Sequence, residues 1–447
     1  MKYGHKINMK IEGYDEKGRG YGKIEILPGE IRNVVTPFTA QGEEIEAVFV
    51  KREYGLKICK LDKIIKPGPD RIKTSCPNAG ICGGCLWQHL DYQAQLKEKE
   101  RGVRELFNGL GLEGVAKPII PAKEILGYRN RMDFCVGWNG EIGLKEYGAW
   151  NHYVNVNECQ LVKPGVKEIL ETIRQLMKDF DLQPWDAKYF KGDIRYVVIR
   201  DGKNKAQRMI TLVVHDASRL DQEARAFLSD KLKPFCTSLL LGQLLKTTDI
   251  SVAESFETLI GNAWLEENIN GLTYRIHPNS FFQTNSAMAA VLQDEVLKQI
   301  EGSTTLLDLY CGLGFFGIAA AKNKKLNVFG YELDEEAIKL AGENAKLNGV
   351  DGQCEFASGK AEELSWKERE TDTVIIDPPR SGLHPRVVKA LCVMHPKKLV
   401  YVSCNYHRLK DELPAFLPKY KVTSIQPVDL FPQTPHVEVV VTLKTEN

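Results

Sequence analysis

The residue with the clearest chemical potential in this sequence is Cys404, in the segment Ser403-Cys404-Asn405 after the apolar run Lys398–Val402. A short apolar run of this kind is typical of a buried strand, so the thiol is expected where that strand ends. A cysteine there is more often a small hydrophobic residue. A thiolate is also a nucleophile that forms transient covalent bonds, which makes Cys404 a candidate reacting group.

A glycine-rich turn follows another predicted strand, Thr304–Leu309, and runs from Cys311 to Gly317. Glycines allow a ligand to approach the backbone closely at the carboxyl edge of a sheet. A second predicted strand ends at Glu332, where a carboxylate can accept hydrogen bonds from the ribose hydroxyls of an adenosine. The glycine spacing also fits a dinucleotide site, but Asp308 before the glycines can face a cationic ligand and favours S-adenosylmethionine.

The segment Asp377-Pro378-Pro379-Arg380 follows the predicted strand Thr373–Ile376. Two consecutive prolines cannot continue a parallel ladder, so the strand must stop there. A simple strand end would explain the prolines alone. The stop also places Asp377 and Arg380 at the carboxyl edge, where ligands bind in this class of sheet.

A thiol beside a methyl donor suggests chemistry on a pyrimidine. Carbon 5 of uracil is a poor nucleophile until a thiolate adds to carbon 6, and a base must then remove the proton from carbon 5. Glu438, at the start of the predicted last strand His436–Leu443, is the candidate base, and His436 is its competitor. A carboxylate at a strand start is otherwise usually a solvated surface group.

The segment from His277 to Asn285 contains the aromatic pair Phe281 and Phe282 together with amide side chains. An unstacked base needs both aromatic stacking and hydrogen bonds to its pairing edge. A capped helix start with an apolar pair is the structural alternative.

Four of the eleven cysteines form a pattern, with Cys76, Cys82 and Cys85 in one loop and Cys159 after it. The chain is too large for a disulfide scaffold, so free thiols in a reducing cytoplasm are expected. Structural zinc sites usually pair cysteines two to four residues apart, whereas iron–sulfur clusters accept more varied spacings. The pattern alone leaves zinc, an iron–sulfur cluster and unliganded thiols open.

Charge is balanced over the whole chain, with a net charge of +1 for 447 residues. Locally, the stretch from Lys51 to Lys73 carries eight basic residues against three acidic ones. Such a stretch can neutralise phosphates, although lysines also protect strand edges. No apolar stretch is long enough to span a membrane.

The elements that position these groups fall into three predicted parts. Residues 1–67 contain five short strand-like runs, which indicates a small barrel. Residues 68–279 begin with the cysteine loop and a long helix from about Trp87 to Leu110, and continue as a mixed α+β domain. Residues 280–447 alternate strand and helix, which is typical of a doubly wound parallel sheet. The last strand is expected to be antiparallel.

With these motifs in order, the sequence resembles the RNA uracil-5 methyltransferases, the iron–sulfur-containing 5-methyluridine enzymes that act on 23S rRNA or tRNA. The resemblance covers nearly the whole chain. It rests on the segments Ser280-Phe281-Phe282-Gln283-Thr284-Asn285, Asp308-Leu309-Tyr310-Cys311-Gly312, Asp377-Pro378-Pro379-Arg380, Ser403-Cys404-Asn405 and His436-Val437-Glu438.

The resemblance implies roles for individual residues. Cys404 would be the nucleophile and Glu438 the base. The S-adenosylmethionine site would be formed by Gln283, Tyr310, Phe315, Glu332 and Asp377, with Phe315 standing where relatives often have a polar residue. Cys76, Cys82, Cys85 and Cys159 fall on the ligands of a [4Fe-4S] cluster.

The resemblance also implies a fold and partners. Residues 1–67 would be an OB-like, TRAM-type RNA-binding barrel, residues 68–279 the central iron–sulfur domain and residues 280–447 a Rossmann-like methyltransferase domain. The arginines of Tyr128-Arg129-Asn130-Arg131 are candidate RNA contacts, and Tyr406 replaces a proline that many relatives carry. A cytoplasmic monomer is expected, with tRNA and 23S rRNA both open as substrates.

Three other classes of function are open on the residues alone. A nicotinamide-dependent oxidoreductase would use the glycine turn but leave Cys404 and Glu438 without a role. A cytosine-5 methyltransferase shares the thiol chemistry but must recognise an exocyclic amine. A non-catalytic RNA-binding module would need only the barrel and the cysteine loop.

Overall fold

The computed structural model describes residues 2–445, and the chain forms two compact units. The first unit comprises residues 1–102, 144–154 and 431–436. The second comprises residues 103–143, 155–430 and 437–447. Among the described residues, no helix has both the length and the apolar character needed to cross a membrane.

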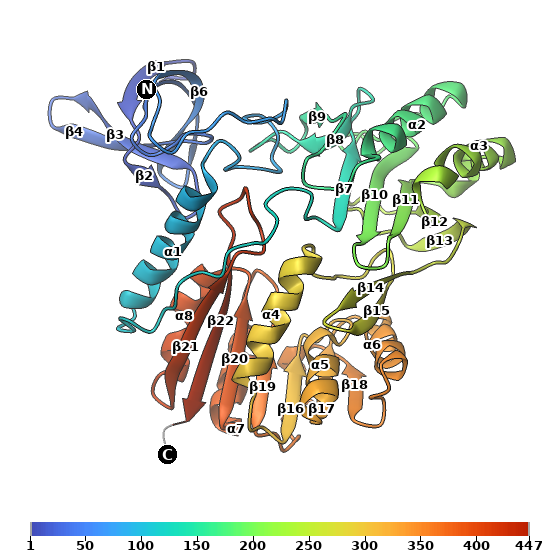
Figure 1. Ribbon diagram of the computed structural model, residues 1–447. Coiled ribbons are helices and arrows are strands. Elements are labelled where there is room, and N and C mark those ends of the chain that lie inside the picture. The colour runs from blue at the N-terminus through green and yellow to red at the C-terminus, as the bar shows by residue number, and fades with distance from the viewer. Residues whose placement is uncertain (1, 446–447) are drawn as a thin grey trace. The chain divides into compact units, whose positions relative to one another are not determined.

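The first unit contains a six-stranded sheet in the order β1-β5-β6-β4-β3-β2 (Figure 1). Alternation along β5 buries Ile45, Ala47 and Phe49 on one face, and these residues form a core with Met9 and Val34. The strands are β1 (Lys6–Lys10), β2 (Gly13–Tyr14), β3 (Gly20–Leu27), β4 (Glu30–Thr36), β5 (Glu44–Glu53) and β6 (Leu56–Lys66).

A second sheet of seven strands has the order β13-β12-β11-β10-β7-β8-β9. Every residue of β10 is buried, because the strand is flanked by β7 and β11. The strands are β7 (Arg131–Val136), β8 (Ile142–Lys145), β9 (Tyr153–Asn155), β10 (Ile194–Gly202), β11 (Gln207–Val214), β12 (Ser238–Gln243) and β13 (Ser255–Ile260). A separate hairpin consists of β14 (Leu265–Ile269) and β15 (Leu272–Ile276).

The third sheet, in the second unit, has the order β18-β17-β16-β19-β20-β22-β21. The strands from β18 to β20 are parallel, and β22 lies antiparallel between β20 and β21. The strands are β16 (Thr305–Leu309), β17 (Asn327–Glu332), β18 (Cys354–Ser358), β19 (Thr373–Ile376), β20 (Lys398–Ser403), β21 (Tyr420–Val428) and β22 (Glu438–Thr445).

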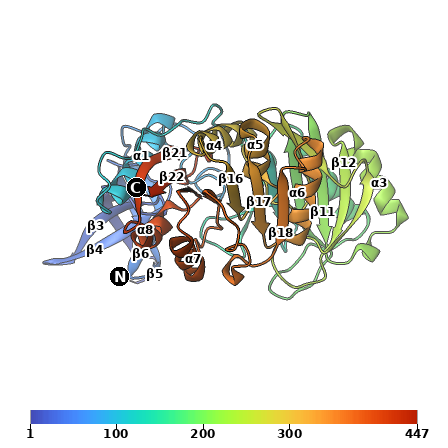
Figure 2. The ribbon, with the colours of Figure 1, turned by 90° about the horizontal axis from the view of Figure 1, so that it is seen from below.

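Helices cover both faces of this third sheet. Figure 2 shows α4 and α5 on one face and α7 and α8 on the other. The helices of the chain are α1 (Tyr92–Asn108), α2 (Val166–Asp179), α3 (Gln222–Leu232), α4 (Ser286–Gln299), α5 (Phe315–Lys324), α6 (Glu335–Leu347), α7 (Pro385–Met394) and α8 (Leu409–Phe416). The arrangement confirms the predicted doubly wound α/β sheet with an antiparallel last strand.

Most of the predicted elements are present, with three differences. The predicted strand Lys6–Tyr14 is broken at Ile11 and Glu12, where the backbone changes its hydrogen-bonding partner from Glu43 to Tyr21. The helix predicted from Trp87 begins only at Tyr92. Strands β18 and β21 were not predicted, since β18 is half-exposed and β21 contains a proline. Strands β7 to β9 and β12 to β15 were not predicted individually either, because that part was expected only as a mixed α+β domain.

Candidate active site

The glycine turn forms the tight link between β16 and α5. Asp308, at the end of the buried part of β16, accepts a hydrogen bond from the Gly317 amide at 2.8 Å through Oδ2. Burial raises the pKa of Asp308 to about 7. Gly312 and Gly314 have positive φ angles of 51° and 80°, a backbone shape that favours glycine. The turn leaves its amides beside the carboxyl edge of the sheet, where a ligand binds in such folds.

Glu332 ends β17 beside this turn, as predicted. Its carboxylate accepts hydrogen bonds from the amides of Gly312 at 3.2 Å, Leu333 at 2.6 Å and Asp334 at 3.1 Å. These three amides fix the orientation of the carboxylate. An acceptor held in this way is suited to hydroxyl groups of a ligand.

A group of acidic side chains lies at the ends of adjacent parallel strands. The pKa of Asp377 is raised well above its ordinary value by burial and by the nearby charges of Glu438, Asp308 and Glu332. Like charges disfavour one another's ionised forms, and a bound cation would relieve this repulsion. The electrostatics of this edge therefore favour a positively charged ligand.

Cys404 and Glu438 come together through the antiparallel pairing of β20 and β22. Ser403 pairs with Val439, so the register places the following Cys404 opposite Glu438. Glu438 is only 3% exposed, and its Oε2 has no hydrogen-bond partner among the described residues. Burial raises the pKa of the Glu438 carboxyl to about 8. The sheet thus brings together the predicted nucleophile and the predicted base.

The ionisation of Cys404 depends on its surroundings. Burial and the negative charges of Glu438 and Asp377 raise the pKa of the half-buried thiol to about 12. The Arg380 guanidinium acts in the opposite direction and lowers the pKa of both Cys404 and Glu438. Arg380 is therefore the nearby group that favours the thiolate.

The turn that carries Arg380 is held by Glu412 and Tyr401, two residues for which the sequence predicted no role. Glu412 of α8 accepts a hydrogen bond from the Leu383 amide at 2.9 Å and another from the Tyr401 hydroxyl at 2.7 Å. Gly382 in this turn has a φ of 81°, a backbone conformation that favours glycine. The Asn405 side chain donates to the Arg380 carbonyl at 3.1 Å. These contacts join the turn to the strand that precedes Cys404.

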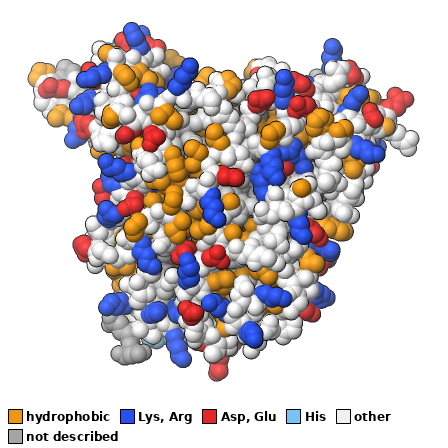
Figure 3. Space-filling view, viewed as in Figure 1, with side chains coloured by type: hydrophobic (Ala, Val, Ile, Leu, Met, Phe, Trp, Pro, Cys, Tyr) orange, Lys and Arg blue, Asp and Glu red, His pale blue; other side chains and the backbone are white. Residues whose placement is uncertain are grey.

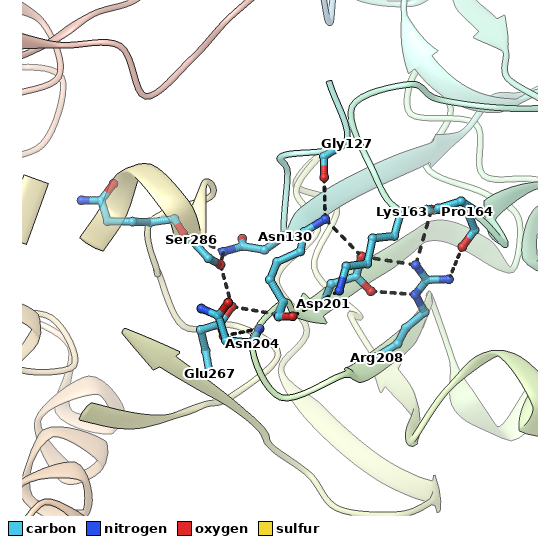
Figure 4. A network of polar contacts seen from close by, with 11 residues as sticks. Gly127, Asn130, Lys163, Pro164, Asp201, Asn204, Arg208, Glu267 and Ser286 are labelled. Carbon is cyan, nitrogen blue, oxygen red and sulfur yellow. Dashed lines mark hydrogen bonds and ion pairs between the residues drawn. The ribbon is translucent and has the colours of Figure 1, made fainter. Parts of the chain in front are cut away.

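Gln283 is buried in the segment before α4, and its backbone is fixed by Asn130. The Asn130 amide side chain donates to the Gln283 carbonyl and to Ser286 Oγ, both at 2.8 Å. Ser286 donates in turn to the fully buried Glu267 at 2.6 Å. Figure 4 shows this network continuing through Asn204 to the neighbouring sheet. Asn130 was noticed in the sequence only as part of an arginine-containing motif.

Of the remaining predicted ligand-binding residues, Phe315 packs against this segment through Phe282 and Tyr310 follows the end of β16. Phe315 packs against the rings of Tyr274, Phe282 and Phe316, which accounts for its burial. Tyr310 has a positive φ of 64°, and burial raises its pKa to about 12. Whether Phe315 and Tyr310 contact a ligand stays a prediction.

Other candidates have structural partners of their own. Arg131 forms an ion pair with Asp133 at 2.7 Å, and Tyr406 stacks on His407 with ring centroids 4.1 Å apart. His436, the competing base, belongs to the first unit, whereas Glu438 belongs to the second. The RNA-contact prediction for the arginines stays untested.

Three of the four predicted metal ligands, Cys76, Cys82 and Cys85, lie in the loop before α1 in the first unit, where Cys82 forms a backbone bridge with Glu146, and Cys159 belongs to the second unit. The Gly84 amide donates to Cys82 Sγ at 3.4 Å, and burial raises the pKa of that thiol. Within residues 2–445, no group of three or more histidine, cysteine or acidic side chains is arranged to hold a metal ion. The N–H···S bond from Gly84 to Cys82 acts in the opposite direction to burial, since it lowers the pKa of that thiol and favours a thiolate there.

The chain matches the family described as tRNA (uracil-5-)-methyltransferase over residues 91–371 and 353–446. It is 36% identical to the tRNA (uracil(54)-C(5))-methyltransferase of Pyrococcus horikoshii, over 93% of this chain and 96% of that protein. It is also 36% identical to the 23S rRNA (uracil(747)-C(5))-methyltransferase of Pyrococcus abyssi, with the same coverage.

Among solved structures, the Pyrococcus abyssi tRNA (uracil-54, C5)-methyltransferase in complex with S-adenosyl-L-homocysteine is similar over the whole length. The TM-score is 0.81 at 33% identity, and the match covers 98% of this chain and 99% of that chain.

Proposed function

This chain belongs to the tRNA (uracil-5-)-methyltransferase family and is an S-adenosylmethionine-dependent RNA (uracil-5-)-methyltransferase. From that premise we propose that it methylates a uridine of tRNA or 23S rRNA through a transient bond between the Cys404 sulfur and carbon 6 of the base. The observation that carries this proposal is the register of β20 and β22, which sets Cys404 opposite Glu438.

Cys404 activates the uracil ring in the proposed reaction. Its thiolate forms a bond to carbon 6, and the electrons of the 5,6 double bond move onto carbon 5 and the carbonyl oxygen at position 4. Carbon 5 then accepts the electrophilic methyl group that S-adenosylmethionine supplies. Arg380, which lowers the pKa of Cys404, stabilises the thiolate that begins this sequence.

Glu438 completes the reaction by removing the proton from carbon 5. The electrons of that C–H bond restore the 5,6 double bond, and the carbon–sulfur bond breaks to return the Cys404 thiolate. Because burial raises the Glu438 pKa to about 8, its carboxylate holds a proton more tightly than an ordinary glutamate does. A base with a pKa close to the working pH is the most effective proton acceptor.

We assign the donor site to Gln283, Tyr310, Phe315, Glu332 and Asp377. Glu332, oriented by three backbone amides, would accept hydrogen bonds from the ribose hydroxyls. The acidic groups beside Asp377 would neutralise the positive charge of the sulfonium. Phe315 would contribute packing rather than polar contacts.

For the RNA, we assign a holding role to the N-terminal sheet, which we take to be a TRAM-like, OB-like barrel. A cavity of about 860 Å³ lies between this sheet and the cysteine loop within the first unit. Its wall contains six cationic side chains and two acidic ones, namely Lys17, Arg19, Lys51, Lys60, Arg71 and Lys73 against Glu53 and Glu146. Five of the cations form ion pairs with Glu43, Glu53 or Glu146, which a phosphate would have to replace. Such a wall suits a phosphate backbone.

On the face shown in Figure 3, basic and acidic side chains are interspersed over most of the surface, and one group of Lys and Arg side chains gathers to the right of centre. Because the net charge is only +1, general attraction to RNA is weak and local groups of cations must supply it. We further propose that Cys76, Cys82, Cys85 and Cys159 hold a [4Fe-4S] cluster, because these four cysteines fall on the cluster ligands that the family resemblance implies; the N–H···S bond to Cys82 supports a thiolate at that position.

Trapping of the covalent intermediate tests the reaction. Fluorine at carbon 5 cannot be removed as a proton, so RNA with 5-fluorouridine at the target should form a stable protein–RNA adduct, visible as a slower band in denaturing gels. Cys404→Ala should form neither adduct nor product. Glu438→Gln should accumulate adduct with ordinary RNA, because the proton is not removed.

Cys392→Ala is the matched control, since this half-buried cysteine lies on α7 away from Glu438. It should trap 5-fluorouridine RNA as the unaltered protein does. Product formation by Cys404→Ala at the normal rate would refute the covalent route. A colourless protein without iron, purified in the absence of oxygen, would refute the cluster.

A further inference from the structure

A short turn in the central part of the second unit presents two aromatic side chains to solvent. It joins α2 to β10 and is closed by a backbone bridge between Asp186 and Lys191, with the Asp186 amide donating at 2.7 Å. The Asp186 carboxylate also accepts hydrogen bonds from the amides of Lys188 at 2.8 Å and Tyr189 at 3.2 Å. The turn therefore has a defined shape without any contact from its aromatic side chains.

The base of the turn is rigid. Trp185 is almost fully buried, with the His215 ring 4.9 Å and the Arg195 guanidinium 4.2 Å from its ring. A Cβ at Gly192 would lie 2.2 Å from the Pro184 carbonyl oxygen, so the chain packs tightly here. A rigid base holds whatever the tip of the turn presents in one place.

The tip exposes Tyr189 and Phe190, which are 62% and 53% exposed. Phe190 has a φ of 53°, in the left-handed region that residues with a side chain rarely adopt. Two ammonium groups flank the tyrosine ring, with Nζ of Lys188 at 4.9 Å and of Lys191 at 5.6 Å from its centroid. Adjacent exposed rings between two cations cannot be explained by packing of the fold, because they contribute little to its core.

We infer that the Asp186–Lys191 turn is a second RNA-binding site, where an unpaired nucleotide of the substrate stacks on Tyr189 or Phe190 and its phosphates contact Lys188 and Lys191. Aromatic side chains combined with cations form the usual platform for single-stranded RNA, because every base has a π-face and every nucleotide a phosphate. Four residues are too few for the apolar centre of a protein interface. The inference rests on the proposed RNA substrate.

The position of the turn indicates which RNAs reach it. It leads into β10 at Ile194, and the other end of β10 contacts the active-site segment through the Asp201 amide and the Asn130 carbonyl at 2.8 Å. A nine-residue strand spans about 26 Å at about 3.3 Å per residue. This distance equals roughly eight stacked nucleotides if each rises about 3.4 Å, the value for a B-form duplex. A hairpin with fewer than about eight nucleotides on either side of the target uridine is therefore too short to use this site.

Binding measurements with long and short RNA test the inference. The probes are full-length tRNA and 23S rRNA transcripts and hairpins cut from each around the candidate uridine, with dissociation constants measured at one salt concentration. For the long RNA that binds more tightly than its hairpin, the double variant Tyr189→Ala/Phe190→Ala should weaken binding about tenfold, within the range for loss of a stacked base. Binding of the hairpin should stay unchanged.

Two controls separate stacking from other causes. The exchanged pair Tyr189→Phe/Phe190→Tyr keeps both rings and should bind within about twofold of the unaltered protein. Val393→Ala, an exposed apolar residue on α7, should have no effect. Three outcomes would each overturn the inference. The double variant could lose equal affinity for long and short RNA, or it could lose none for either, as expected if the turn binds a protein. The full-length RNA could also bind no more tightly than its hairpin. Because binding is measured without turnover, this result is independent of the Cys404 adduct.

Discussion

Glu332 and Glu438 lie at the same edge of one sheet, yet the surroundings of their carboxylates differ. Glu332 ends β17 with both carboxylate oxygens held by backbone amides of Gly312, Leu333 and Asp334. Glu438 begins β22, is almost fully buried, and has an oxygen without a hydrogen-bond partner among the described residues. Burial raises its pKa to about 8.

The difference separates a binding group from a reacting group. A carboxylate held by several N–H donors is stabilised as an anion and presents a fixed acceptor to a ligand. A buried carboxylate with a free oxygen is destabilised as an anion and takes up a proton readily. A buried oxygen without a hydrogen-bond partner lowers the stability of the fold, so its presence indicates a functional role.

Replacing each of these two glutamates by glutamine should have the largest effects on the kinetics. Glu438→Gln should lower kcat by roughly 10²- to 10⁴-fold, the usual contribution of a general base, with KM for S-adenosylmethionine nearly unchanged. Glu332→Gln should instead raise KM for S-adenosylmethionine roughly tenfold, as expected for weakened hydrogen bonds to a charged acceptor. Steady-state kinetics with saturating RNA measures both.

Each variant is the control for the other, since both replace a strand-end glutamate by its amide. A similar rise in KM for the two, with kcat preserved in both, would contradict the separation of roles. Thermal unfolding should show that neither substitution unfolds the protein.

The pH dependence of activity should follow the ionisation of Glu438. A base acts only when deprotonated, so activity that depends on a carboxyl with a pKa of about 8 is low below that pH and rises through it. From pH 7 to pH 9 the ionisation of Glu438 should contribute roughly a tenfold rise in kcat/KM, because one pH unit below the pKa only about a tenth of the group is ionised. The Cys404 thiol, with a pKa of about 12, adds a further rise that does not level off in this range. In Glu438→Gln, this rise centred near pH 8 should be absent. An unaltered profile in that variant would show that another group titrates there.

Much of this site could be predicted from the sequence because its residues follow strand ends. Parallel strands bring their carboxyl ends to one edge, so the positions of Asp308, Glu332, Asp377 and Cys404 followed from strand placement alone. The pairing of Cys404 with Glu438 did not, because β21, on the other side of β22, was not predicted and the register was unknown.

The groups that hold the site could not be predicted, because they act through contacts between distant segments. Asn130 fixes the backbone of Gln283 across 153 residues, and its side chain gives no sequence signal. Tyr401 reads as an ordinary strand residue, and Glu412 as a residue of an amphipathic helix. Their hydrogen bond exists only after α8 packs beside β20.

The smallest expected effect concerns Arg380, whose charge acts on Cys404 and Glu438, the proposed reacting groups. Tyr401→Phe removes one hydrogen bond to Glu412 and loosens the Pro379–Leu383 turn. The loss of about 0.5–1.5 kcal/mol for one hydrogen bond corresponds to roughly a two- to thirteenfold fall in kcat if it displaces Arg380. Because Arg380 lowers the pKa of Glu438, its displacement should also move the rise in kcat/KM to higher pH.

The shift in the pH profile distinguishes positioning of Arg380 from a general loss of stability. Tyr420→Phe is the matched control, since this buried tyrosine of β21 donates to the Pro396 carbonyl at 3.0 Å and does not contact the turn. It should reduce thermal stability by a similar amount and leave the pH profile in place. If both variants lower kcat equally with unshifted profiles, Tyr401 only stabilises the sheet, and the ionisation of Glu438 does not depend on where this turn holds Arg380.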